Sequence, residues 1–302
     1  MLKHNLKKMR TQYQLYLLLI PTIVFFIIFH YWPMLGAQIA FRNFQPLAGI
    51  WGSPWVGFHH FERFFNSPQF SVIVRNTLAI SITQLVFAFP IPIILALQLN
   101  HLRSLRFKSV VQTITYAPFF ISMVVKVGML HIFASPRTGI FNIILREFGV
   151  EPIFFFGEPG WFLPMFVGSH IWQTAGWSSI IYLAALSAID PSLHEAAMAD
   201  GASKLQRIRH IDLPGLLPTI VILLIISVGQ IMNVGFEKTF LMQTPLNIGR
   251  SEVISTFVYK VGLLNIQYSY ATAVGLFNSV INMTLLIMVN FVARRVGESS
   301  LW

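Results

Sequence analysis

The chain alternates between long apolar runs and short polar segments, and the apolar runs have the length of membrane-spanning helices. An α-helix of about 20 residues crosses the hydrocarbon core of a bilayer. The runs of this length lie at residues 13–32, 72–97, 109–133, 162–189, 216–236 and 268–292. The pattern therefore predicts six transmembrane helices, with both chain ends on the same side of the membrane.

Helices satisfy their own backbone hydrogen bonds in lipid, so the predicted fold class is an all-α membrane protein. The sequence contains no internal repeat and no separate polar domain. We therefore expect a short N-terminal segment, residues 1–12, followed by one transmembrane domain, residues 13–302. Pro90, Pro92 and Pro118 predict kinks in the second and third spans.

Basic residues indicate the orientation, because short cytoplasmic loops of membrane proteins are enriched in Lys and Arg. With the N-terminus inside, the inner segments contain Lys3, Lys7, Lys8, Arg10, Arg103, Arg106, Lys108, Lys204, Arg207, Arg209, Arg294 and Arg295. The longer outer segments contain Arg42, Arg63, Arg137, Arg146, Lys238, Arg250 and Lys260. We therefore expect a multi-pass protein of the cell membrane with both termini in the cytoplasm.

The composition supports membrane insertion and excludes several functions. Hydrophobic residues make up 55% of the chain, charged residues 11%, and the mean hydropathy is +0.66. The net charge of +10 is scattered between apolar runs, which argues against a nucleic-acid partner. Cysteine is absent, and no phosphate loop or zinc-protease motif occurs. We expect no catalytic residue, metal site or cofactor on this chain.

Residues 190–214 form a polar segment between the fourth and fifth spans. Asp190 and Pro191 are typical of a helix start, and Gly201 suits the left-handed residue that ends a helix. Ser203 and Gln206 have the spacing of a capping box. The segment is predicted to form two short helices joined at an elbow, and Pro214 opens the next apolar run.

The first of these helices has a face suited to docking. Leu193, Ala196 and Ala197 lie at helical spacing and are small or apolar, while Glu195 places a charge beside them. A helix that enters a groove on a partner needs small residues on its contact face. The alternative is a well-formed, solvated helix without a partner, and for the isolated segment the two interpretations stay equally open.

The spacing of this segment resembles a known motif. Glu195-Ala196-Ala197, followed by Gly201 and then by Ile211, Leu213 and Pro214, is similar to the "EAA loop" of permease subunits in ABC importers. In that family the loop forms a coupling helix that docks on a cytoplasmic ATPase. The resemblance assigns ATPase coupling to Leu193, Glu195, Ala196, Ala197, Asp200, Gly201 and Ala202.

Polar and aromatic residues inside the predicted spans suggest a substrate pathway. A sugar packs its C–H face on an aromatic ring and needs directional partners for its hydroxyls. The candidates are Tyr116, Trp172, Gln173, Trp177, Asn278 and Asn282. Packing and helix-to-helix hydrogen bonds are the alternative. Lys126 is the clearest charge within a span, and we expect it to extend toward the outer interface.

Four sequence stretches, each less specific than the EAA loop, are similar to the carbohydrate branch of these permeases, which transports oligosaccharides and polysaccharide fragments. They are Asn76-Thr-Leu, Ala117-Pro-Phe-Phe-Ile-Ser, Gly235-Phe-Glu-Lys and the run from Tyr268 to Gly275. The resemblance implies the six-helix type I importer fold and a set of partners. These are a second permease subunit, two ATPase subunits that bind ATP and Mg, an extracellular binding protein, an oligosaccharide and membrane lipid.

Three alternatives remain at this point. The same loop type occurs in permeases for non-sugar solutes. A secondary transporter would need acidic residues within its spans, whereas every Asp and Glu here lies in a loop or at a span end. An intramembrane enzyme would need a nucleophile facing a base, and His170 with Ser178 or Ser179 are poorly placed for that role.

Overall fold

The computed structural model describes residues 13–295, which are mostly helical and contain no β-strand. The predicted fold class is confirmed. The chain divides into two compact units, one made of Met1–Asn66 and Val258–Leu276 and the other of Ser67–Phe257 and Phe277–Trp302. Residues 1–12, expected to be cytoplasmic, lie outside the described residues, and the single domain over residues 13–302 stays a prediction.

The first unit begins with a long apolar helical segment whose large side chains are exposed, as expected of a helix that contacts lipid. Its elements are α2 (Tyr13–Phe26), η1 (Ile27–Tyr31), α3 (Trp32–Met34), η2 (Leu35–Phe41), α4 (Gly49–Gly52), α5 (His59–Phe65) and η6 (Lys260–Leu264). Two further helices, α17 (Ile254–Tyr259) and α18 (Tyr268–Arg295), each contain residues of both units.

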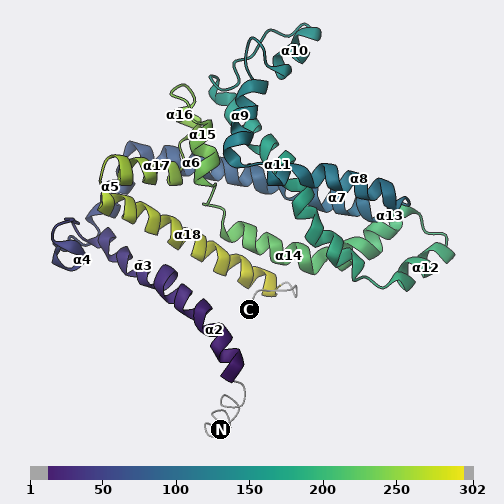
Figure 1. Cartoon of the computed structure of the whole chain (residues 1–302), viewed down its shortest axis with the longest axis horizontal. Helices are drawn as coiled ribbons and strands as arrows, with labels where there is room; N and C mark the ends of the chain where they lie inside the picture. Colours follow the sequence, from purple (N-terminus) through teal and green to yellow (C-terminus); the bar gives the residue numbers. More distant parts are fainter. Residues whose placement is uncertain (1–12, 296–302) are drawn as a thin grey trace. The chain divides into compact units, whose positions relative to one another are not determined.

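The second unit contains the remaining helical elements, of which Figure 1 labels the α-helices. They are α6 (Pro68–Thr83), η3 (Gln84–Ala88), α7 (Pro90–Asn100), α8 (Leu105–Tyr116), η4 (Ala117–Phe120), α9 (Met123–Phe133), α10 (Ile140–Glu147), α11 (Pro159–Ser187), α12 (Pro191–Ala199), α13 (Lys204–Arg207), η5 (Ile208–Asp212), α14 (Leu213–Gly229), α15 (Phe236–Met242) and α16 (Ile248–Ser251). Among the described residues, the longest uninterrupted α-helices are α11 and α18.

Each of the six predicted spans corresponds to a helical segment. Within the described residues, four segments are long and apolar enough to cross a membrane: Tyr13–Phe41, Pro68–Asn100, Lys204–Gly229 and Tyr268–Arg295. A bent pair of helices in the predicted third span makes a fifth. The predicted fourth span is α11, whose 29 residues are long enough but include polar side chains that lower its mean hydropathy.

The third span is broken rather than continuous. Leu105–Phe120 and Met123–Phe133 meet at an angle of 100°. Pro118 lies in the 3₁₀ turn η4, Ile121 is extended, and Ser122 accepts a hydrogen bond from the Val125 backbone and so starts a new helix. The predicted disturbance at Pro118 is therefore a full break three residues further on.

Prolines also explain three of the four wide helical turns of the described residues, η1, η3 and η5, whereas no proline follows the fourth, η6. Each of the three ends two residues before a proline, namely Pro33, Pro90 and Pro214. A proline has no N–H to donate and its ring collides with the carbonyl four residues earlier. In each case the residue before the proline donates its N–H five residues back, which relieves this conflict with a local π-turn.

The turn η5 corrects one prediction. Residues 204–214 were expected to form a short helix that ends before a separate fifth span. Instead, α13, η5 and α14 run on as one segment, Lys204–Gly229, because the π-turn accommodates Pro214 without a break. The fifth span therefore begins within the polar loop.

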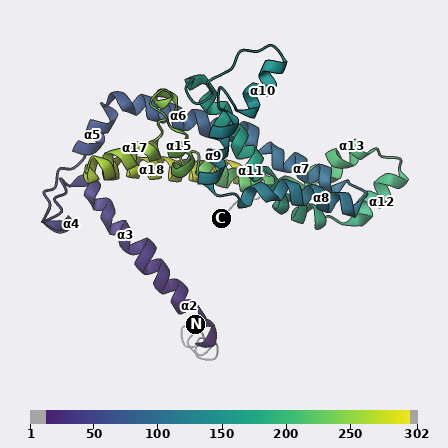
Figure 2. The same ribbon diagram turned by 45° about the horizontal axis from the view of Figure 1, so that its top comes forward.

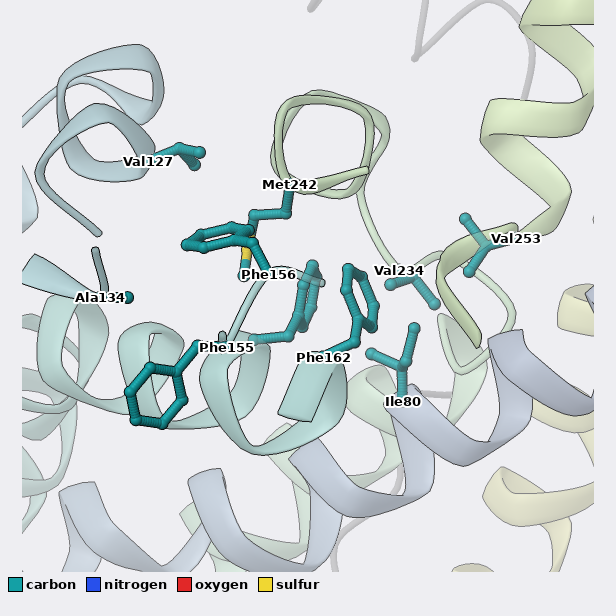
Figure 3. Packing of buried hydrophobic residues seen from close by; sticks show 10 residues of the cluster. Ile80, Val127, Ala134, Phe155, Phe156, Phe162, Val234, Met242 and Val253 are labelled. Carbon is teal, nitrogen blue, oxygen red and sulfur yellow. The ribbon is translucent and has the colours of Figure 1, made fainter. Parts of the chain in front are cut away.

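Two hydrophobic clusters stabilise the second unit. The first gathers Phe155, Phe156 and Phe162 with Ile80, Val234 and Met242, as Figure 3 shows. The second joins α7, α11 and α14 through Ala96, Leu97, Leu99, Tyr182, Leu183, Leu186 and Leu216. This second cluster lies next to the polar loop 190–214 and gives it a rigid base.

Candidate functional site

The helix α12 carries the predicted docking face, and its ends are capped as the sequence predicts. Asp190 accepts a hydrogen bond of 2.9 Å from the Ser192 backbone N–H, which lowers the pKa of its carboxyl below the ordinary value of 3.8. Gly201 has a φ of +78°, and Ser203 and Gln206 form the capping box. These caps explain locally why the chain forms α12 here.

Most of α12 is exposed. Leu193 is 52% exposed, and Glu195, Ala196, Asp200 and Gly201 are exposed as well, while Ala197 and Ala202 are half-buried. Both views of the ribbon place α12 and α13 at the end of the second unit beside the connection between α7 and α8 (Figures 1 and 2). The helix thus presents an apolar, accessible face at one end of its unit.

A buried carboxylate connects α12 to the rest of the unit. Asp212, in η5, is 0% exposed. Its Oδ2 accepts a hydrogen bond of 2.6 Å from Nε2 of His101, and its Oδ1 lies 3.2 Å from Nε2 of His194 on α12. The second contact lacks hydrogen-bond alignment, since Oδ1 has no such partner among the described residues. One carboxylate thus contacts α12 and the α7–α8 turn.

A cavity of about 820 Å³ lies within the second unit, between α6–α7, α11 and α14. Its polar lining residues are Ser81, Gln84, His170, Thr174, Ser178, Ser227, Gln230 and Asn233. Trp177 adds an aromatic surface and stacks on Phe119 with ring centroids 4.5 Å apart. Hydroxyl, amide and aromatic groups in one cavity suit an uncharged polar surface such as that of a sugar.

The structure brings only some predicted pathway residues to this cavity. Trp177 lines it, whereas Trp172 lines a separate cavity of about 410 Å³ beside Lys126. Gln173 is buried and donates to the Ile121 carbonyl at 2.9 Å. Gln173 therefore serves packing between α11 and the broken third span.

Three further candidates line neither cavity. Tyr116 is half-buried at the end of α8. Asn282 accepts a hydrogen bond of 3.0 Å from the Met232 backbone N–H, and Asn278 Oδ1 is buried without a partner among the described residues. Asn282 thus makes a structural hydrogen bond between α18 and the turn that follows α14, close to the alternative of hydrogen bonding between helices.

Lys126 differs from the expectation that it extends to the outer interface. It is 1% exposed and donates a hydrogen bond to the Gln173 side-chain oxygen. The prediction failed because Gln173, 47 residues away, offers an acceptor that the sequence alone does not place beside Lys126.

The cluster around Asp212 and most of the cavity lining were not predicted from the sequence. Asp212 stands between the motif residues Ile211 and Leu213, and a carboxylate among apolar residues could have signalled burial. The partner His101 is 111 residues away, so no local pattern connects them.

Comparison with known proteins decides the family. The family of binding-protein-dependent transport system inner membrane components matches residues 88–298. The chain belongs to this family. Its exposed α12 carries the Glu195-Ala196-Ala197 motif that suggested an ABC importer permease. The protein is therefore a transport permease subunit, an integral membrane component with an all-helical fold.

Curated permeases align over almost the whole chain. Protein LplB of Bacillus subtilis (strain 168) is 42% identical over 288 residues, covering 95% of this chain and 91% of LplB. The polygalacturonan/rhamnogalacturonan transport system permease protein YteP of the same organism is 41% identical over 300 residues, covering 99% of this chain and 94% of YteP.

Solved structures show the same fold. A bacterial ABC transporter involved in the import of the acidic polysaccharide alginate contains a chain that is 41% identical, with a TM-score of 0.90 and coverage of 98% and 100%. A second alginate transporter structure, in complex with a periplasmic protein bound to alginate pentasaccharide, gives the same identity and TM-score. The type I importer fold expected from the EAA loop is confirmed.

Proposed function

We propose that this permease is one membrane subunit of an ATP-driven importer for an oligosaccharide or polysaccharide fragment. An extracellular binding protein delivers the sugar, and the polar cavity beside Trp177 forms part of its path. The names of YteP and of the alginate transporters support a polysaccharide-derived substrate. A second permease subunit completes the membrane pore.

The exposed α12 carries this proposal. Leu193, Glu195, Ala196, Ala197, Asp200, Gly201 and Ala202 form or border a surface that docks on the ATPase. Its apolar face lies at the end of its unit, available to a partner. Two ATPase subunits bind ATP and Mg²⁺, and this chain binds neither. ATP binding moves the docked helix, which turns the bundle between outward-open and inward-open states.

Shape and apolar burial must provide most of the coupling energy. Moving a two-state equilibrium from 1:99 to 99:1 requires about 5.5 kcal/mol. An exposed ion pair formed by Glu195 contributes about 0–1 kcal/mol. Burial of Leu193 and Ala196 in a groove of the ATPase therefore matters more than the charge.

Labelling of a single cysteine tests the position of α12. The chain has no cysteine, so Ala196→Cys provides one unique thiol without a background signal. A membrane-impermeant maleimide should label it in inside-out vesicles but not in right-side-out vesicles. Bound ATPase should block the labelling, and a matched Ser53→Cys variant, whose side chain is buried, reports nonspecific labelling.

Two results contradict the proposal. Labelling of Ala196→Cys in right-side-out vesicles would place α12 outside the cell, where no ATPase could reach it. Equal labelling with and without the copurified ATPase would show that α12 is not the docking surface.

A further inference from the structure

Two lysine side chains are buried against the helix α11. Lys126, on α9, is 1% exposed, and Lys238, on α15, is 4% exposed. Lys126 donates to the side-chain oxygen of Gln173. Lys238 donates to the Phe166 carbonyl at 2.5 Å, and its Nζ lies 4.2 Å from the centre of the Phe166 ring.

Neither ammonium group forms an ion pair with a carboxylate in residues 13–295. Glu237 acts on Lys126 electrostatically, but it is exposed and remains beyond ion-pair distance. An ammonium group has three N–H donors, and each of these two uses one. A buried, unneutralised cation is costly, and within a membrane protein such groups occur mainly where function needs them.

The two lysines flank the face of α11 that reaches the cavity. Phe166, His170, Gln173 and Trp177 follow one another at spacings of four, three and four residues, so they share one helix face. The attachment points Phe166 and Gln173 are about 10 Å apart along the helix. His170 lies between them, interacts electrostatically with both lysines, and lines the 820 Å³ cavity with Trp177.

The cavity itself offers no opposing charge. Its lining in the described part of the chain consists of uncharged polar, aromatic and apolar residues around His170, with no Asp or Glu. A ligand beside His170 therefore meets the field of the two lysines with no acidic side chain in the cavity lining. In a poorly solvated site this field favours a carboxylate over a neutral group by more than it would in water.

We propose that Lys126 and Lys238 select a substrate that carries carboxylates, namely an oligosaccharide of uronic acids. The carboxylates are attracted by the field of the two lysines, of which Lys126 lines the neighbouring 410 Å³ cavity, and the hydroxyl and amide groups of the 820 Å³ cavity bind the neutral part of the sugar. This inference rests on the proposed import function and names the substrate class for the same cavity.

Two probes of equal length separate charge from shape: trigalacturonate and its neutral methyl ester. The complete importer, with its ATPase, second permease and binding protein, is placed in liposomes, and the KM of uptake is measured for both. Lys126→Met and Lys238→Met keep the length of the side chain and remove its charge. Lys126→Arg and Lys238→Arg retain the positive charge. Arg250→Gln removes a charge from an exposed residue and serves as the control.

The methionine variants should raise the KM for trigalacturonate about tenfold, which corresponds to about 1.4 kcal/mol. Their KM for the methyl ester should stay within about twofold of wild type, and the arginine variants should recover most of the affinity for the acid. If the wild-type importer accepts only the acid, the difference between the methionine and arginine variants for that probe is the readout.

Other outcomes overturn the inference. An equal rise of the KM for both probes, together with less assembled complex on size-exclusion chromatography, would show that the lysines stabilise the structure or pair with a carboxylate of the second permease. Unchanged KM values would exclude a role in selection. A wild-type importer that moves only neutral oligosaccharides would refute the carboxylate assignment and leave the import function standing, whereas no sugar-dependent uptake at all would refute that function itself.

Discussion

His194 on the exposed helix α12 lies 3.2 Å from the buried carboxylate of Asp212 in η5, with Nε2 facing Oδ1. Among the described residues, this is the one side-chain polar contact that α12 makes outside its own capping segments. Asp212 in turn accepts a hydrogen bond from His101 at the start of the α7–α8 connection. Movement of α12 can therefore reach two transmembrane segments through one carboxylate.

Asp212→Asn should uncouple transport from ATP hydrolysis. The change removes the carboxylate that contacts both histidines, while the proposed docking face of α12 is unaltered. We expect the number of substrate molecules imported per ATP to fall about tenfold, with ATP hydrolysis retained. A loss of stability of about 1–3 kcal/mol should accompany it, because a buried polar partner is weakened.

Parallel measurement of uptake and ATP hydrolysis checks this prediction, with His194→Gln expected to act in the same direction. Arg209→Gln, an exposed residue of the same π-turn, is the control. If uptake and hydrolysis decrease together in Asp212→Asn, the carboxylate stabilises the loop without transmitting its movement.

Crowding of the proposed docking face on α12 should reduce coupling to the ATPase more than loss of its charge. Ala197→Trp adds bulk at the half-buried edge of α12, and Gly201→Asp places a side chain where φ is +78° and space is open. Both should lower uptake at least tenfold by preventing ATPase docking. Glu195→Gln should lower it by less than about fivefold, because an exposed ion pair contributes about 0–1 kcal/mol.

Copurification of the ATPase with each variant distinguishes these cases. Gly201→Asn is the matched control for Gly201→Asp, because Asn tolerates the left-handed conformation and differs mainly in charge. Full ATPase binding and uptake in Ala197→Trp would show that this part of α12 does not enter the groove.

The local features of α12 could be predicted from the sequence, whereas its attachment could not. Asp190, Gly201 and Ser203 act within a few residues of their positions, so their spacing predicts the caps. The contact between His101 and Asp212 joins segments separated by 111 residues and depends on how α7 and η5 pack. The same reason explains why Lys126 was wrongly expected at the interface.

The break in the third span could be predicted in part from the sequence. Pro118 predicted a disturbance, and Ser122 is a suitable first cap for a new helix, so the signal was present. Its 100° angle depends on the packing of α9. Of the six predicted pathway residues, Trp177 lines the polar cavity and the other five do not. The sequence gives the depth of a residue within a span, but it does not determine which helix face points toward the cavity.

Trp177→Ala should weaken transport more than Trp172→Ala. Trp177 lines the polar cavity and stacks on Phe119, and Trp172 lines the apolar cavity beside Lys126. Loss of an aromatic surface costs about 0.5–1.5 kcal/mol beyond its buried area, so the KM for the oligosaccharide should rise about three- to tenfold in Trp177→Ala. In Trp172→Ala it should change less than twofold, and a reversed order would move the sugar path to the second cavity.

Gly176→Ala should destabilise the protein through one close helix contact. A Cβ at Gly176 would collide with the Thr115 backbone carbonyl, so α8 and α11 can approach here because the side chain is absent. Relief of the clash requires a backbone shift, and we expect a loss of about 1–3 kcal/mol. Thermal unfolding in detergent measures this loss of stability. Gly168→Ala on the same helix is the control, because a Cβ there meets nothing within 4 Å.

Acidification should destabilise the first unit through His60. This residue is buried, and its Nε2 donates to the Arg42 carbonyl at 3.1 Å. Burial lowers the pKa of its imidazole below the ordinary value of 6.5, so the unfolded chain binds the proton more readily than the folded protein. The contribution of His60 to stability is therefore present above pH 6.5 and is lost as the pH falls through the lowered pKa. Melting temperatures should decline less steeply between pH 8 and pH 5 in His60→Gln than in wild type. His59→Gln, at the exposed neighbouring position, is the control. If His59→Gln reduces the pH dependence equally, the proton is not taken up at His60.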